Sequence, residues 1–212
     1  MLFSDICIKF NKKIFMKALL YSALFCFLTT TVAMAQPSDK TSGTESTKKS
    51  ADKSINWMSF EEVMAANKKT PKKIMVDVYT EWCGPCKMMM ANTFTNPVII
   101  DYINKNYYAV KFNAESGGEI TFQGKKYSNP GYDPSKGGRN ATHELTQAIA
   151  PVNGRIAYPT IVYMDEQLNI LSPVQGYYQP EQIEPILKYF GENVYQKETF
   201  EDFQKSFVSD LK

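Results

Sequence analysis

The sequence lacks a charge of one dominant sign. Its 24 lysines and arginines are nearly balanced by 22 aspartates and glutamates. Four of the lysines and one of the acids lie within residues 1–35, so the rest of the chain carries 20 basic and 21 acidic residues. Proteins that bind nucleic acid usually carry a clear basic excess, because they neutralise phosphates. No nucleic-acid partner is therefore expected.

Long apolar runs are missing except near the start, where Ala18–Val32 is almost continuously apolar. Lysines precede this run and the small residues Ala33 and Ala35 follow it, which is typical of a secretory signal peptide. Residues 1–35 are therefore predicted to be a cleaved signal peptide, and the protein is expected to be exported to the periplasm. The run is marginal in length for a membrane span. A secreted form, or one tethered by an uncleaved signal, stays open as an alternative.

Apolar residues are also nearly absent from residues 36–54, which consist mostly of Ser, Thr, Lys and Asp. Such a composition cannot bury a core, so this segment is predicted to be a flexible linker. The character of the sequence changes at residue 55. Because the whole chain is 43% hydrophobic and 13% aromatic, residues 55–212 are predicted to fold as one domain.

Cysteine and histidine are scarce as well. Cys7 and Cys26 belong to the predicted signal peptide, which leaves Cys83, Cys86 and a single histidine, His143. A structural zinc site needs four such ligands, so no metal is expected. A purely structural disulfide between Cys83 and Cys86 would close a very small loop and add little stability. Thiol–disulfide exchange fits the pair best, and a Cu(I) metallochaperone is an alternative.

Periodicity and capping signals predict alternating helices and strands. Helices are expected at 59–70, 84–91, 96–106, 141–150, 179–191 and 199–211. Strands are expected at 72–80, 107–114, 159–165 and 170–177, with a hairpin at 118–128 that turns near Gly124. The first two strands should be parallel and the last two antiparallel. The fold class is therefore α/β, a mixed central sheet flanked by helices, with an insert (114–139) after the second core strand and an extra C-terminal helix.

The segment EWCGPCK, Glu81–Lys87, joins a predicted strand to a predicted helix. At this junction a Cys83 thiolate faces free backbone N–H groups and the positive end of the helix dipole, which lowers its pKa and makes it nucleophilic. Cys86, one turn later, is placed to attack a mixed disulfide and release the product. Gly84 and Pro85 make the turn tight and keep bulky side chains away from the sulfur.

The segment VDVYTEWCGPCK, Val76–Lys87, resembles the active-site segment of the thioredoxins, and its last six residues are similar to it residue for residue. The resemblance implies a thioredoxin fold over about residues 57–190 and disulfide oxidoreductase activity without a bound cofactor. In that family the first cysteine, here Cys83, attacks and the second, here Cys86, resolves. The aromatic residue before them, here Trp82, flanks the pair.

The same resemblance assigns roles to two residues of neighbouring strands. Asp77 stands six residues before Cys83, where thioredoxins carry a buried acid that deprotonates the resolving cysteine. A buried carboxyl group has a raised pKa, which suits a base that works near neutral pH. Lys111 matches the strand lysine beside this acid. An ordinary strand-edge acid and a solvent-facing lysine are the alternatives.

The segment AYPTIVYMD, Ala157–Asp165, resembles the thioredoxin loop in which a cis-proline precedes a strand. Pro159 is therefore expected to be cis and to lie beside the cysteines, with the backbone of Tyr158 pairing with the substrate chain. Tyr158 is bulkier than the usual residue, so the fit of the substrate is expected to differ. An ordinary trans proline is the alternative.

Ala91 departs from the thioredoxin pattern, because it occupies the position of a helix-kinking proline. The stretch Cys86–Tyr107 instead resembles exported thioredoxin-like proteins and the soluble C-terminal domain of transmembrane thiol–disulfide interchange reductases. That resemblance implies a protein disulfide reductase that acts on protein thiols and disulfides and receives electrons from a membrane or soluble donor protein. A thiol oxidase or isomerase of the same fold and a client-binding module without turnover are the alternatives.

The insert, residues 114–139, leaves a strand end that should share a sheet edge with Cys83, because the two strands are expected to be parallel. We expect it to wall the active site and narrow the choice of substrate; a loop away from the site is the alternative. His143 is expected on a helix surface. Met88, Met89 and Met90 are expected to fill the core and surface rather than bind copper.

Overall fold

The computed structural model describes residues 54–211. The predicted signal peptide lies outside the described residues, and so does the predicted linker except for Ser54. No helix in the described part is long and apolar enough to cross a membrane. Its strands are β1 (Trp57–Met58), β2 (Lys73–Tyr79), β3 (Tyr107–Asn113), β4 (Ile120–Phe122), β5 (Lys125–Tyr127), β6 (Thr160–Met164) and β7 (Ile170–Gln175). Its α-helices are α1 (Phe60–Lys69), α2 (Gly84–Met88), α3 (Pro97–Asn106), α4 (Glu144–Ile149), α5 (Pro180–Gly191) and α6 (Phe200–Ser206).

Five strands form the central sheet in the order β1-β3-β2-β6-β7. β2 lies in the middle, parallel to β3 and antiparallel to β6. Six of its seven residues are buried, because helices cover both faces of the sheet. Burial on both faces explains why the β2 sequence is almost continuously apolar. The predicted α/β class with a mixed sheet is therefore confirmed.

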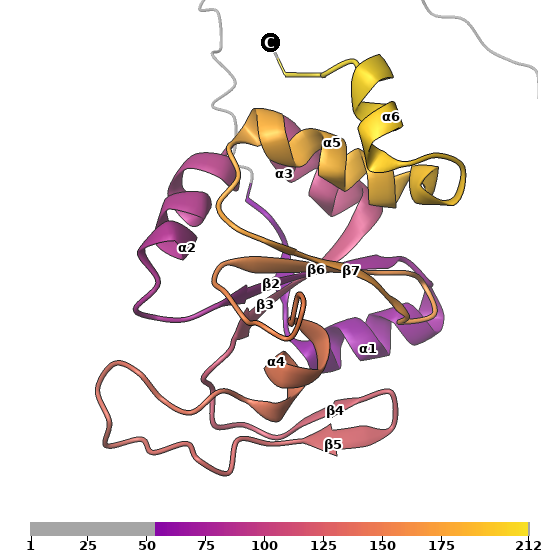
Figure 1. The fold of residues 1–212 in the computed structure, drawn as a ribbon. Coiled ribbons are helices and arrows are strands. Elements are labelled where there is room, and N and C mark those ends of the chain that lie inside the picture. Colours follow the sequence, from indigo (N-terminus) through magenta and orange to yellow (C-terminus); the bar gives the residue numbers. More distant parts are fainter. Residues whose placement is uncertain (1–53, 212) are drawn as a thin grey trace, which may run out of the picture. The chain divides into compact units, whose positions relative to one another are not determined.

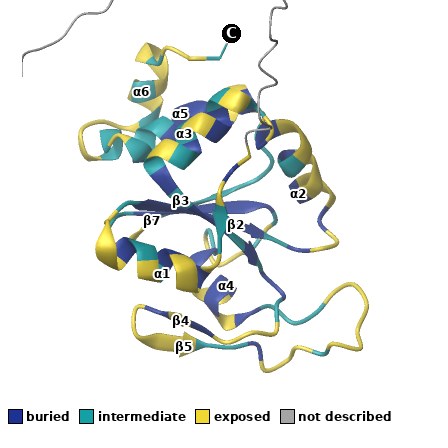
Figure 2. Ribbon diagram, turned by 180° about the vertical axis from the view of Figure 1, so that it is seen from behind, coloured by how far each residue is buried: buried dark blue, intermediate teal, exposed yellow. Residues whose placement is uncertain are grey.

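Helices cover both faces of this sheet (Figure 1). α3 and α5 pack on one face, over a core that includes Ile103, Tyr163 and Leu187. α1 and α4 pack on the other face, over a second core that includes Val63 and Leu145. In Figure 2 the strands of the sheet are mostly buried, whereas α6 has no buried residue. The sheet and its two helical layers thus form the rigid frame that positions the residues at its edges.

Two helices start where their capping residues predict. Ser59 accepts a hydrogen bond from the N–H of Glu62, and Glu62 accepts one from the N–H of Ser59, so a capping box begins α1. Asn96 accepts hydrogen bonds from two backbone N–H groups at the start of α3. Pro97 occupies the first turn of that helix, where its missing N–H costs nothing.

Two elements differ from the prediction. The sequence does not predict β1, which has only two residues and pairs with β3. The helix expected to run to residue 91 instead changes after α2 into a π-helical turn, Met89–Thr93. There the N–H of Phe94 donates to the carbonyl of Met89. After this wider turn the Phe94 ring lies edge-on against Trp57, with ring centroids 5.3 Å apart.

The prediction for His143 is wrong. Its side chain is fully buried rather than on a helix surface, and α4 begins only after it, at Glu144. Nδ1 of His143 accepts a hydrogen bond from the N–H of Leu145, which caps the helix. Nε2 therefore carries the proton and donates to the carbonyl of Gly118, 2.8 Å away. Histidine is not a common cap, so the sequence offers no signal for this role.

The insert divides into two parts. The hairpin of β4 and β5 turns at Gly124, which has a positive φ, as the sequence predicts. The hairpin packs Phe122 against Phe60 of α1, with ring centroids 6.0 Å apart, so it belongs to the core. The loop after β5 returns toward the sheet, where Asn129 donates to carbonyl groups near both ends of the insert. These hydrogen bonds hold the two ends of the insert together.

The predicted C-terminal helix is present, but α6 ends at Ser206 rather than at residue 211. Phe200 and Phe203 pack against Tyr189 of α5, as expected for a helix that covers the domain. The chain then leaves the helix, because the buried carboxylate of Glu184 accepts hydrogen bonds from the tail that follows. The sequence pattern of spaced phenylalanines does not reveal this anchor.

Candidate active site

A disulfide joins Cys83 and Cys86 at one edge of the central sheet. β2 and β3 run parallel and end at this edge, whereas the antiparallel β6 begins there. Cys83 follows the end of β2, the insert follows the end of β3, and Pro159 immediately precedes β6. The sheet topology therefore brings three segments that are distant in the sequence to the same place.

Cys83 is the N-cap of α2. Its Sγ accepts a hydrogen bond from the N–H of Cys86 at 3.1 Å. Gly84 and Pro85 form the first turn, with open space around Gly84. Both cysteines are buried, and only 2% of Cys83 is exposed. A partner sulfur therefore reaches Cys83 only by passing the side chains that surround it.

Asp77 lies in the middle of β2 with 2% of its surface exposed, so it is not an ordinary strand-edge acid. Burial raises the pKa of Asp77 from 3.8 to about 7, and the charge of Lys111 opposes part of this shift. Lys111 is the register partner of Asp77 on β3, and its Nζ lies 4.9 Å from the centroid of the Tyr79 ring. The sheet thus holds a carboxyl group that exchanges its proton near neutral pH.

A cavity of about 370 Å³ opens beside Cys86. Lys87, Lys111 and Thr80 line it together with this cysteine. The Thr80 hydroxyl is buried and has no hydrogen-bond partner among the described residues. The sequence does not single out Thr80, because one threonine after a strand carries no signal. The cavity places the second cysteine and the lysine that acts on Asp77 in the same recess.

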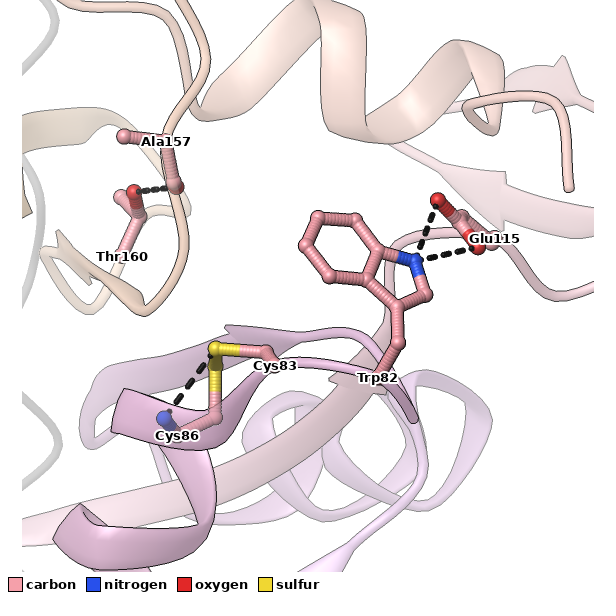
Figure 3. The surroundings of a disulfide bond; sticks show 6 residues. All are labelled: Trp82, Cys83, Cys86, Glu115, Ala157 and Thr160. Atoms are coloured by element: carbon pink, nitrogen blue, oxygen red, sulfur yellow. Dashed lines mark hydrogen bonds between the residues drawn. A yellow bond between two sulfur atoms is a disulfide. The ribbon is translucent and has the colours of Figure 1, made fainter. Parts of the chain in front are cut away.

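The peptide bond between Tyr158 and Pro159 is cis, as the sequence predicts. Thr160 Oγ1 donates to the carbonyl of Ala157 across this turn, and Figure 3 shows the Trp82 ring between the turn and Glu115. The Tyr158 ring packs edge-on against Trp82, with ring centroids 5.9 Å apart. The bulky Tyr158 side chain therefore touches the residue that precedes Cys83.

Residues from the two ends of the insert region surround Trp82. Its Nε1–H donates to both carboxylate oxygens of Glu115, at 3.0 and 3.1 Å. The N–H of Asn140 also donates to Glu115, at 2.9 Å. The guanidinium carbon of Arg139 lies 4.2 Å from the centroid of the Trp82 ring. The sequence predicts an insert at this edge, but it does not single out Glu115, Arg139 or Asn140. The whole insert lies between Glu115 and the other two, so no sequence spacing indicates that they meet.

A metal centre and a larger cavity are the two alternative places for a functional site. The described residues contain no cluster of three His, Cys, Asp or Glu side chains that could hold a metal ion. A larger cavity of about 650 Å³ lies between β7, α5 and α6, and no cysteine or histidine lines it. Chemistry rather than size therefore places the candidate site at Cys83 and Cys86.

The thioredoxin-like domain family matches residues 60–191. Among curated proteins, no significant match is found. A thioredoxin-fold protein from Helicobacter pylori is 19% identical with a TM-score of 0.46, covering 64% of this chain and 80% of that chain. A thioredoxin from Thermus thermophilus is 14% identical with a TM-score of 0.45, covering 64% and 85%. The oxidised DsbD C-terminal domain of Neisseria meningitidis is 16% identical with a TM-score of 0.39, covering 65% and 97%.

Likeness to solved structures at these identities and TM-scores says nothing about substrates or partners. The family match has more weight, because it spans more than half of the chain and includes Asp77, Cys83, Cys86 and Pro159. A thioredoxin-like domain with a disulfide between two such cysteines is consistent with thiol–disulfide oxidoreductase activity. This chain therefore belongs to the thioredoxin-like family.

Proposed function

We propose that this protein is an exported protein disulfide reductase that works through Cys83 and Cys86. The observation that supports this best is the meeting of three parts at one sheet edge. The cysteine pair starts α2, Asp77 lies buried in the strand before it, and the cis Pro159 begins the neighbouring strand. A disulfide that served stability alone would need neither a carboxyl group with a raised pKa nor a cavity beside one cysteine.

The first step of the proposed reaction belongs to Cys83. In the reduced protein its thiolate attacks one sulfur of a client disulfide. A bond forms between Cys83 and that sulfur, the client S–S bond breaks, and the second client sulfur leaves as a thiolate. The N–H of Cys86, which points at Sγ of Cys83, and the α2 dipole both stabilise the attacking thiolate.

The second step belongs to Cys86. Asp77, with a pKa of about 7, accepts the proton of the Cys86 thiol. The Cys86 thiolate then attacks Cys83, which forms the protein disulfide and breaks the bond to the client. Two electrons have passed from the protein dithiol to the client disulfide, and the client leaves as a dithiol.

The oxidised pair must be reduced before the next turnover. We assign this step to a membrane or soluble electron-donor protein, because thiol–disulfide exchange needs no bound cofactor. The predicted export makes such a donor necessary, since disulfides persist in oxidising compartments such as the periplasm. The clients are protein thiols and disulfides of that compartment.

Insulin reduction tests the enzymatic part of the proposal. With dithiothreitol as electron source, the purified protein should speed insulin reduction, and Cys83→Ser should lower the rate to the uncatalysed background. Cys86→Ser should accumulate a mixed disulfide with insulin, visible on a non-reducing gel. Met88→Ser, an exposed change on α2, serves as the matched control and should keep the activity. Equal rates for the unchanged protein and Cys83→Ser would refute the proposal.

The reduction potential of the pair tests the direction. It should be measured against glutathione and dithiothreitol with Cys7 and Cys26 replaced by serine, so that Cys83 and Cys86 are the only thiols. A reduction potential of about −270 mV, the thioredoxin range, supports a reductase. A value between about −120 and −180 mV would show an oxidase or isomerase instead.

A further inference from the structure

We propose that Arg139 recognises an acidic side chain of the client near the client's cysteine, so that the end of the insert selects acidic segments. This inference rests on the proposed function, because the client must bring a sulfur to Cys83. It adds to that function a residue that determines specificity and the chemistry of the segment that the residue binds.

The first observation concerns the hydrogen-bond donors of Arg139. Its side chain is exposed, and within residues 54–211 it takes part in no ion pair or hydrogen bond; its contact is with the Trp82 ring. An arginine carries five N–H donors in a planar fork. Contact with an aromatic face holds a guanidinium in place but occupies none of the donors at its edges. The fork of Arg139 is therefore positioned and still free to bind.

The second observation is that Glu115, the acid that binds the same indole ring, is not the partner of this fork. Glu115 forms no ion pair with Arg139; its oxygens accept hydrogen bonds from Trp82 Nε1 and from the N–H of Asn140. The bond from Asn140 also fixes the backbone directly after Arg139. Glu115 thus orients the ring and the loop, and it leaves the guanidinium to a partner from outside the chain.

The third observation is that the sulfur of Cys83 is hard to reach from solvent. Cys83 is 2% exposed, whereas the preceding Trp82 is 38% exposed. A client that reaches Cys83 must therefore lie against the surface that Trp82, Tyr158 and Arg139 form together. If the client carries a charged side chain within a few residues of its own reacting cysteine, that side chain comes within reach of Arg139.

The chemistry of the partner follows from charge and shape. Carboxylates are the anionic groups that protein clients carry, and their two oxygens match the guanidinium fork. An aspartate or glutamate near the client's cysteine is therefore the group that Arg139 binds.

Single-turnover reduction of synthetic disulfides tests the proposal. The clients are disulfide-linked dimers of short peptides with one cysteine, in three series that carry Glu, Gln or Lys two residues before or after it. The reduced full-length protein, with Cys7 and Cys26 changed to serine, is mixed with each dimer, and the reaction is stopped by alkylation. We expect the Glu dimer to react about two- to fivefold faster than the Gln dimer in at least one position, the upper part of the range that an exposed ion pair provides.

Variants at Arg139 sharpen this test. Arg139→Gln should bring the ratio of Glu to Gln rates to about one, and Arg139→Glu should make the Lys dimer the better client. Arg139→Lys keeps the charge without the fork and should give an intermediate ratio. Lys136→Gln removes one positive charge from an exposed residue of the same loop and should leave the ratio as in the unchanged protein.

Three outcomes would overturn the inference. Equal rates for all dimers in the unchanged protein would do so while the proposed function stood. An Arg139→Gln variant that slows every dimer alike and shifts the reduction potential would show that Arg139 acts on the disulfide and not on the client. If no dimer is reduced, the proposed function fails. In that case equal binding of the Glu and Gln peptides to Cys83→Ser would overturn the recognition claim as well.

Discussion

The two flanks of the disulfide are built in different ways. The Cys86 flank, formed by Asp77, Lys111 and the cavity beside Cys86, contains a buried carboxyl group with a pKa of about 7. The Cys83 flank, formed by Trp82, Tyr158 and the ends of the insert, lies at the surface and carries a guanidinium that has no ion-pair partner among residues 54–211.

We therefore assign proton transfer to the Cys86 flank and recognition of the client to the Cys83 flank. The Cys86 flank is assembled from neighbouring strands whose register brings Asp77 and Lys111 together. The Cys83 flank depends on the chain returning through a long insert, which a thioredoxin fold does not require. Reaction chemistry is therefore expected to depend on the first flank, and the choice of client on the second.

The largest expected effect concerns Asp77. The unfolded chain ionises this residue near pH 3.8 and the folded chain near 7, so between these values unfolding releases a proton. The free energy of unfolding therefore falls as the pH rises, by about 4 kcal/mol in total. Asp77→Asn should lack this fall, and urea unfolding of both oxidised proteins from pH 4 to pH 8 measures the difference.

The control for this measurement is Glu81→Gln, which removes an exposed carboxylate just after β2. This variant should keep the pH dependence of the unchanged protein. If Asp77→Asn and the unchanged protein show the same dependence, Asp77 is ionised in the folded state throughout, and the contrast between the two flanks is lost.

A smaller effect is expected on the Cys83 flank. Glu115→Ala leaves Trp82 Nε1 and the N–H of Asn140 without their acceptor, and hydrogen bonds to a charged group contribute about 2 kcal/mol. Urea unfolding should show a loss of this size, with a change in Trp82 fluorescence in the folded protein. Glu119→Ala breaks only an exposed ion pair with Lys126 and should change stability little. Equal stability of the two variants would contradict the assignment of Glu115 as an anchor.

The smallest expected effect is the coupling within the Cys86 flank. Lys111→Met removes the positive charge that lowers the pKa of Asp77, so the midpoint of the pH dependence should move above 7. The same unfolding series measures this midpoint. Lys87→Met removes a charge from the same cavity, but Lys87 is not a cause of the Asp77 shift and its loss should leave the midpoint in place. A midpoint unchanged by Lys111→Met would show that the two residues are not coupled.

Much of the fold could be predicted because local patterns and tertiary packing agree. Several local patterns predict their elements directly: the apolar run of β2, the caps at Ser59 and Asn96, and the turn at Gly124. The predictions are wrong at positions where contact with a residue far away in the sequence determines the local structure. Phe94, after the π-helical turn, packs against Trp57, and the buried His143 finds a hydrogen-bond acceptor in the carbonyl of Gly118.

The sequence by itself determined the candidate cysteine pair and its neighbours on β2 and α2. Asp77, Trp82, Cys83 and Cys86 lie within one strand–helix junction, where the resemblance to the thioredoxin segment singles them out. Only the tertiary structure decided that Glu115 and Arg139 meet at Trp82. Their common contact with Trp82 depends on how the two ends of the insert are held together, by hydrogen bonds between residues far apart in the chain.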